Sequence, residues 1–257
     1  MTTTLQTVSR AIAMLRAFEG GQSKPLTLKE LSETLSLSKM NTLRLAKTLV
    51  QEGLLAYDFQ TRRYSLSWGC FALVREMAQG QGLREIALPS LEAARDATSE
   101  TACLMVREGW HRVVAASVHS RLPIRYVLDV GERRPVYFGA AGQCLMSGLT
   151  AKEWQDLFAH LAREKASGRP CPTPELLQQR QDVLKSNGWY SGTGEWAPDA
   201  SGAAAPVYGA RGQVLAAVTI AAPLTRASAT YMEQCGRAAM TAAQAITAEL
   251  VGRGGTL

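Results

Sequence analysis

The chain has 257 residues, of which 46% are hydrophobic and 19% charged, an ordinary composition for a globular protein with room for two domains. Its net charge of +6 is unevenly spread: residues 1–66 hold nine basic and five acidic side chains, whereas the rest hold nineteen and seventeen. This distribution predicts a phosphate-bearing partner for the N-terminal part and a different partner for the nearly neutral remainder.

The first residues, Met-Thr-Thr-Thr-Leu-Gln, lack the charged and apolar regions of a secretory signal, and no apolar run approaches the length of a bilayer span. The cysteines are odd in number and scattered, which favours reduced thiols over a disulfide framework. We therefore expect a cytoplasmic protein with no membrane partner. The five cysteines are Cys70, Cys103, Cys144, Cys171 and Cys235.

After a first helix over about 8–18, residues 27–66 have the pattern of a helix-turn-helix followed by a basic hairpin. Thr27 and Glu30 have capping-box spacing. Leucines at 28, 31 and 35 then form one apolar stripe on a short helix. A brief turn at 36–37 leads to Ser38, a good N-cap for a second helix that runs to about Glu52.

The second helix has an apolar face (Leu45, Ala46, Leu49, Val50) and a polar face roughly opposite. Amide and guanidinium groups on an exposed helix are what reading of the major groove requires. Isolated basic residues usually form a solvated helix face, but here helix, turn, helix and basic hairpin follow in order, which favours DNA. The candidate DNA-binding residues of this helix are Ser38, Lys39, Asn41, Arg44 and Lys47.

Gly53 ends the second helix, and residues 54–57 and 64–66 can pair as strands around a loop at 58–63. Two arginines at this loop, Arg62 and Arg63, are placed to contact phosphate or the minor groove, so the hairpin is predicted to be the wing of a winged helix-turn-helix.

The remaining sequence predicts an α+β domain with a largely antiparallel sheet covered by helices. A helix over 68–79 precedes it as a linker. The expected helices are 83–98, 140–149, 151–166, 173–186 and 228–251, and the expected strands are 101–106, 112–117, 124–128, 189–190, 203–208 and 214–222, with a loop at 131–135.

The chain resembles the IclR-type bacterial transcriptional regulators over about residues 5–250. The resemblance rests on the order and spacing of several stretches together. These are Val8-x-x-Ala11-x-x-x-Leu15, Leu49-x-x-x-Gly53-Leu54, Arg63-Tyr64-x-Leu66, Pro135 to Gly142, and Ala204-Ala-Pro206 leading to 214–223.

The resemblance implies a winged helix-turn-helix (residues 1–66), a linker helix (67–82) and a GAF-like domain for effector binding and oligomerisation (83–257). It also implies operator DNA, a small-molecule effector and a homodimer or tetramer as partners. The implied effector-binding residues, together with the apolar walls that strand alternation suggests, are Met105, Tyr126, Ala140, Ala141, Glu195, Trp196, Ser201, Gly202, Thr219 and Ala221.

The chain departs from the family pattern in the predicted pocket. Gln143 replaces a frequent lysine, the segment 191–194 lacks an acidic pair, and Thr219-Ile-Ala221 replaces a Ser-x-Ser arrangement. With fewer hydroxyls and with aromatic residues at 126, 137 and 196, we expect an aromatic or otherwise larger organic acid to be the effector, in a regulator of a catabolic operon.

Other chemistry has little support. The three histidines lack metal-ligand spacing, no Gly-x-Ser-x-Gly motif occurs, and Cys144 is expected to be a small core residue. We therefore expect no metal, cofactor or catalytic residue. Glu195 can point into the pocket or into solvent. The alternative functions are a C-terminal domain that serves only dimerisation or one that has an unrecognised enzymatic activity.

Overall fold

The computed structural model describes residues 5–18, 24–70, 82–195 and 197–252. The chain divides into two compact units, residues 1–81 and 82–257, which are described separately here. Most of the linker helix expected over 68–79 lies outside the described residues, because residues 71–81 are not among them. Trp196 lies outside them as well. No helix in the described ranges has the length and apolar character needed to cross a bilayer.

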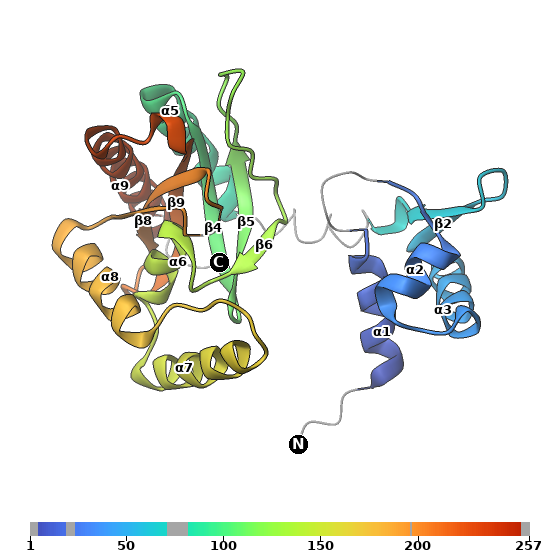
Figure 1. Cartoon of the computed structure of the whole chain (residues 1–257). Helices are drawn as coiled ribbons and strands as arrows, with labels where there is room; N and C mark the ends of the chain where they lie inside the picture. The colour runs from blue at the N-terminus through green and yellow to red at the C-terminus, as the bar shows by residue number, and fades with distance from the viewer. Residues whose placement is uncertain (1–4, 19–23, 71–81, 196, 253–257) are drawn as a thin grey trace. The chain divides into compact units, whose positions relative to one another are not determined.

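The N-terminal unit contains three described helices and a small antiparallel sheet (Figure 1). Met14, Leu31, Ala46 and Leu49 are buried where the helices meet, and Tyr64 closes this core from the sheet. The helices are α1 (Gln6–Arg16), α2 (Leu28–Leu35) and α3 (Lys39–Gln51), and the sheet has the order β1-β3-β2 with β1 at Leu26–Thr27, β2 at Leu55–Asp58 and β3 at Arg63–Leu66.

The helix-turn-helix forms as its sequence predicts. The Thr27–Glu30 capping box is present at the start of α2, and Ser38 caps α3 by accepting a hydrogen bond from the Asn41 amide at 3.3 Å. Between the helices, Ser36 adopts a left-handed φ of 51° that ends α2. The sequence did not predict β1, because a strand of two residues shows no alternation; it pairs Leu26 with Tyr64.

The C-terminal unit contains a sheet in the order β6-β5-β4-β9-β8-β7, with every pair antiparallel (Figure 1). This agrees with the expected α+β class. The strands are β4 (Thr101–Glu108), β5 (His111–Val118), β6 (Arg133–Pro135), β7 (Tyr190–Thr193), β8 (Ala200–Tyr208) and β9 (Val214–Pro223).

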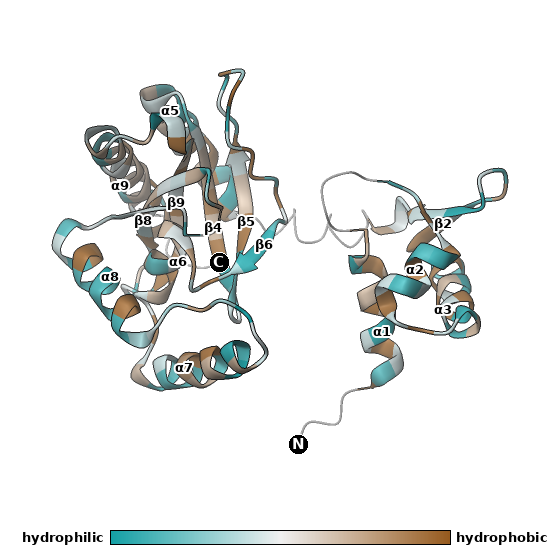
Figure 2. Ribbon diagram, viewed as in Figure 1, coloured by the Kyte–Doolittle hydropathy of each residue, from teal (hydrophilic) through white to brown (hydrophobic). Residues whose placement is uncertain are grey.

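Helices cover both faces of the sheet. On one face, α5 (Gly82–Thr98) and α9 (Ala229–Gly252) pack against side chains such as Leu104 and Ile220. On the other face, α6 (Gly139–Met146), α7 (Ala151–Ala166) and α8 (Pro174–Asn187) enclose Met105 and Val114. Most strands are apolar to match these two cores, but β6 at the sheet edge is hydrophilic (Figure 2).

The third strand was predicted at the wrong place. Residues 124–128 alternate in hydropathy like a strand, but they form an irregular loop in which Ile124 is 70% exposed and Leu128 is buried. The strand that pairs with β5 is β6, within the segment expected to be a loop. Side chains rather than a strand ladder hold the carbonyls of Ile124 and Tyr126.

A β-bulge changes the direction of side chains along β5. Leu104 pairs with Ala116 and Met105 pairs with Val114, so Ala115 is the extra residue. Ala116 therefore faces the α5 and α9 side with Leu104, whereas Val114 faces the α6 side with Met105. Arg112, two residues before Val114, faces the α6 side as well.

Candidate functional site

The second helix of the helix-turn-helix, α3, is the candidate recognition helix, and it presents the predicted polar residues to solvent. Asn41, Arg44 and Lys47 are all exposed, and their spacing of three places them along one side of α3, while Ala46 and Leu49 point into the core. Ser38 and Lys39 are exposed at the helix start. Anionic phosphate is favoured at this end by the helix dipole and by the lysine charge.

The two wing arginines have different environments. Arg62 lies in the turn between β2 and β3, is exposed and has a φ of 55°. Arg63 begins β3, donates from Nη1 to the carbonyl of Pro25 at 2.7 Å, and lies 3.4 Å from the Glu30 carboxylate. Arg62 is therefore available to a phosphate, whereas Arg63 ties the wing to the start of α2.

A shallow hollow of about 230 Å³ lies beside the recognition helix. Asn41, Arg44 and Thr48 of α3 line it together with Thr7 and Arg10 of α1. The sequence did not single out Arg10, because its position on the first helix carries no motif. Its charge adds to that of Arg44 on the same surface.

In the C-terminal unit, a cavity of about 60 Å³ opens between the sheet and the loop that precedes α6. Eight of the ten predicted effector residues line it. Ala141 does not, because it is fully buried in the core, and Trp196 lies outside the described residues. The eight are Met105, Tyr126, Ala140, Glu195, Ser201, Gly202, Thr219 and Ala221.

The sequence missed the residue that dominates the cavity electrostatically, Arg112. It is 6% exposed, its Nη1 donates to the Met105 sulfur at 3.3 Å, and its Nε has no partner among the described residues. Burial, and secondarily the nearby charge of Arg134, lower the pKa of Arg112 to about 10. The guanidinium thus remains cationic at neutral pH, with donor capacity left over.

Arg134 also lines the cavity, directly across from Arg112 in the β5–β6 ladder. Like charges in this position repel each other. The Arg134 charge is offset, because its Nε donates to Glu132 at 2.7 Å and its Nη1 donates to the Tyr126 hydroxyl at 3.3 Å. Among the residues that the structure describes, no carboxylate forms an ion pair with Arg112.

Glu195 points inward and is fully engaged. Its carboxylate lies 2.9 Å from Arg180 Nη1 and accepts hydrogen bonds from the Gly139 amide at 2.9 Å and the Tyr190 hydroxyl at 2.8 Å. Burial, together with the Glu195 charge, raises the pKa of Tyr190, so this hydroxyl stays protonated. Glu195 therefore braces the loop before α6, and its charge acts on Arg112 only at a distance, without a hydrogen bond between these two described side chains.

Two hydroxyls complete the polar lining. Thr219 is 4% exposed, and its Oγ1 has no hydrogen-bond partner in the described part of the chain. Ser201 shares a 2.8 Å hydrogen bond with Thr193. Arg112 and Thr219 are thus two unsatisfied buried groups on one small cavity, an arrangement that a ligand with acceptor atoms would satisfy.

A signal for Arg112 was present in the sequence, since a lone arginine in the apolar run His111–Val118 is unusual for a strand covered on both faces. The bulge at Ala115 could not be anticipated, so the face that Arg112 occupies was hidden. Cys144 is fully buried as predicted, and burial strongly raises the pKa of its thiol. In the described residues no three metal-ligating side chains form a cluster.

Each of the two units matches the model of a known protein family. The model of the IclR helix-turn-helix domain matches residues 7–58, and the model of the bacterial transcriptional regulator IclR C-terminal domain matches residues 75–248. The chain is 26% identical over 216 residues to the HTH-type transcriptional regulator KipR of Bacillus subtilis, covering 84% of this chain and 85% of that protein.

Two further similar proteins are a curated regulator and a solved structure. The Pca regulon regulatory protein of Pseudomonas putida is 25% identical over 231 residues, covering 90% of this chain and 78% of that protein. The crystal structure of an IclR homolog from Microbacterium hydrocarbonoxydans, complexed with 4-hydroxybenzoate, superposes with a TM-score of 0.78 at 20% identity, covering 96% of this chain and all of that one.

Proposed function

The chain belongs to the IclR family of bacterial transcriptional regulators, and on that basis we propose that its affinity for operator DNA responds to a small organic acid held by Arg112. Its relatives are named as regulators and not as enzymes. The regulated genes are proposed to form a catabolic operon; the relative from Pseudomonas putida is named as the regulatory protein of a regulon.

The buried, cationic and incompletely hydrogen-bonded guanidinium of Arg112 is the observation that carries the acid proposal. A buried charge without an ionic partner costs free energy, and a protein that keeps one at a cavity gains when an anion binds there. A carboxylate is planar and accepts two parallel hydrogen bonds from a guanidinium. Thr219 can donate to the same ligand from β9.

The size of the cavity narrows the class of acid. At about 60 Å³ it holds a carboxylate and a few further atoms, well below the roughly 300–1,000 Å³ of typical ligand pockets. A compact acid fits without rearrangement. An aromatic acid, which the sequence favours and the structural neighbour bound to 4-hydroxybenzoate supports, is larger than this cavity, and we propose that it binds by displacing the irregular wall at Tyr126 and Leu128.

For DNA, we propose that Asn41, Arg44 and Lys47 enter the major groove while Ser38, Lys39 and Arg62 contact the backbone. These side chains are exposed on one unit and carry donors for bases and phosphates. In this proposal Arg63 does not contact DNA but holds the wing to the start of α2. A homodimer or tetramer is proposed as the binding form, since one recognition helix reads only a few base pairs.

The test is a thermal-shift screen of the intact protein against compact and aromatic carboxylic acids, followed by calorimetry on each hit with wild type and Arg112→Met. The expected result is an acid that binds the wild type and whose affinity falls at least about 100-fold in Arg112→Met, the loss of a charged hydrogen-bonded contact. Equal affinity of both proteins would place the acid elsewhere. Gel-shift titration with and without that acid then measures the response on DNA.

A further inference from the structure

One wall of the cavity is an irregular loop that has no strand partner. Residues 119–132 connect β5 to β6, and within their central part, 121–130, Tyr126 and Leu128 line the cavity. A loop without a ladder must be positioned by other contacts if it is to shape a ligand site. Three side chains supply such contacts to backbone carbonyls. His119, which follows β5 directly, has its Nε2 3.3 Å from the carbonyl of Leu128. Two further side chains, from more distant parts of the chain, hold carbonyls two residues apart.

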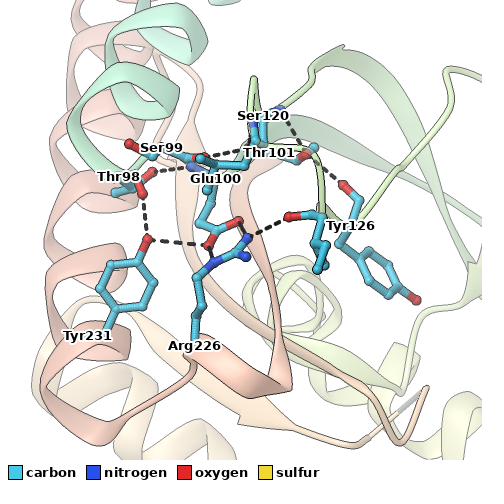
Figure 3. A network of polar contacts seen from close by, with 10 residues as sticks. Thr98, Ser99, Glu100, Thr101, Ser120, Tyr126, Arg226 and Tyr231 are labelled. Atoms are coloured by element: carbon cyan, nitrogen blue, oxygen red, sulfur yellow. Dashed lines mark hydrogen bonds and ion pairs between the residues drawn. The ribbon is translucent and has the colours of Figure 1, made fainter.

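The first contact comes from Arg226, in the 3₁₀ turn Leu224–Arg226 between β9 and α9. Its Nη2 donates to the carbonyl of Ile124 at 3.0 Å. The same guanidinium forms a two-pronged pair with the fully buried carboxylate of Glu100, with Nε 2.6 Å from Oε1 and Nη2 2.8 Å from Oε2 (Figure 3). Glu100 thus fixes the arginine that holds the loop.

The second contact comes from Thr101, the residue after Glu100. Its hydroxyl donates to the carbonyl of Tyr126 at 2.6 Å and accepts a hydrogen bond from the Ser120 amide at 3.1 Å (Figure 3). Thr101 begins β4, so its side chain lies on the face opposite that of Glu100. Glu100, through Arg226, and Thr101, directly, therefore contact the loop from opposite faces of the same backbone segment.

That point joins the principal elements of the unit. Glu100 follows the C-terminal end of α5, where Tyr231 of α9 donates to the carbonyl of Thr98 at 2.5 Å and lies 3.4 Å from Glu100 Oε1 (Figure 3). A continuous chain of polar contacts therefore joins the loop to the end of α5 and the start of α9. In sequence, α5 is the first described helix after the N-terminal unit.

We propose that Glu100, Arg226 and Thr101 form a latch that positions the Tyr126–Leu128 wall of the acid cavity and couples its displacement to the junction of α5 and α9. The inference rests on the proposed function, because the wall shapes a ligand only if the acid binds there. None of the three residues lines the cavity, so they are positioning residues. A larger acid that pushes the wall outward strains the latch, whereas a compact acid does not.

Hydrogen–deuterium exchange on the intact protein tests the latch without requiring a ligand. Thr101→Val removes the hydroxyl while keeping the shape. We expect the hydrogen-bonded amides in and beside residues 121–130, those of Leu122, Gly131 and Glu132, to exchange at least about tenfold faster than in wild type, a loss of about 1.4 kcal/mol of local protection. Thr101→Ser keeps the hydroxyl and should restore slow exchange. Arg226→Gln should also accelerate amide exchange in this loop.

The matched control is Glu233→Gln, which breaks the surface pair between Glu233 and Arg237 on α9 and should leave residues 121–130 unchanged. Wild-type exchange of the loop in both Thr101→Val and Arg226→Gln would overturn the latch. A rise spread evenly over the whole C-terminal unit would also overturn it, because that result indicates global destabilisation.

Repeating the exchange with 4-hydroxybenzoate and with acetate separates the two proposals. If 4-hydroxybenzoate changes exchange at 121–130 and at the end of α5 in the wild type, and only at 121–130 in Thr101→Val, the coupling is supported. A change at 121–130 that never reaches α5 in the wild type would overturn the coupling. If no acid binds the wild type by calorimetry, the proposed function fails, whereas the variants without acid still test the latch.

Discussion

The Nη1 of Arg112 lies 3.3 Å from the sulfur of Met105 on the neighbouring strand, so a buried guanidinium has a thioether as its acceptor. Sulfur is a weak acceptor compared with a carboxylate. The pairing leaves most of the charge of Arg112 uncompensated in a place with little water, at the wall of a cavity. The predictions below follow from this charge and from the surfaces described above.

Replacement of Arg112 by methionine should remove acid binding and at the same time stabilise the fold. Because burial lowers the pKa of Arg112 to about 10, the folded chain binds this proton more weakly than the unfolded chain, and the charge costs stability at neutral pH. This cost is relieved as the pH rises through about 10. We expect Arg112→Met to raise the free energy of unfolding by about 1–3 kcal/mol in urea titrations near pH 7.

The control is Arg107→Met on the adjacent strand, which loses a 2.8 Å pair with Glu153 and should be neutral or slightly destabilising. A destabilised Arg112→Met protein would show that the guanidinium is better compensated than its contacts indicate.

Acid binding should be nearly constant from about pH 7 to about pH 9 and should weaken above about pH 10, because Arg112 titrates there. Three charged neighbours also shift the pKa of Arg112: Arg134 lowers it, whereas Glu132 and Glu195 raise it. Burial raises the pKa of the nearby Cys103 thiol to about 12, so that thiol stays neutral. Calorimetry across this range is the measurement. A midpoint near pH 6.5 would instead point to a histidine.

Filling the cavity should separate ligand response from DNA binding. Ala221 lines the cavity, so Ala221→Leu is expected to abolish the acid-induced change in a gel shift while operator binding persists, since the two units fold around separate cores. Ala141→Leu is the comparison. It inserts volume into a filled core and should lower the free energy of unfolding by about 1–3 kcal/mol, measured in urea titrations.

On DNA, Arg44→Ala should weaken specific operator binding by about 1–3 kcal/mol if the side chain reads a base. Arg62→Ala should weaken all sequences alike and reduce the slope of log affinity against log salt by about 0.9. Arg63→Ala should act through stability, because Arg63 holds Pro25 and Glu30. Gel-shift and salt titrations distinguish these three variants. Unchanged operator binding by an Arg44→Ala, Lys47→Ala double mutant would contradict the proposal that this side of α3 contacts the DNA bases.

Oligomerisation is expected to involve α1. Val8 is 52% and Ile12 47% exposed on the N-terminal unit, one turn apart, which is an unfavourable arrangement for a helix in water. We expect a Val8→Glu, Ile12→Glu variant to lose mass in light scattering and to bind a two-half-site operator more weakly. Val183→Glu, on the comparably exposed Val183 of α8, is the control. Unchanged mass in the double variant would exclude this face.

Much of the fold was predictable from the sequence because its local signals agree with the tertiary structure. The capping box at Thr27, the N-cap at Ser38 and the extended helix α7 are each determined within a few residues. The positions of β1 and β6 were not predictable, since each is two or three residues long and exists only through its partner strand.

The candidate cavity was predicted from family resemblance for its small and hydroxyl-bearing residues but not for its charge. Arg112 and Arg134 meet only because β5 and β6 pair, and a bulge decides which face they share. For Arg63 the sequence suggested a function that its contacts do not favour. A basic residue at a wing is a natural candidate for DNA binding, but the Arg63 side chain donates a hydrogen bond to the carbonyl of Pro25.

The extra residue at Ala115 also bears on how such a protein can change its ligand over evolutionary time. A one-residue insertion between Arg112 and Val114 that shifts the strand register, and is not absorbed as a further bulge, would rotate Arg112 toward α5 and α9 and remove the positive charge from the cavity without altering any existing side chain. Deletion of Ala115 would straighten the strand and keep Arg112 where it is. The charge of such a cavity can therefore change through an insertion that shifts the register of β5, and position-by-position comparison of lining residues would not detect it.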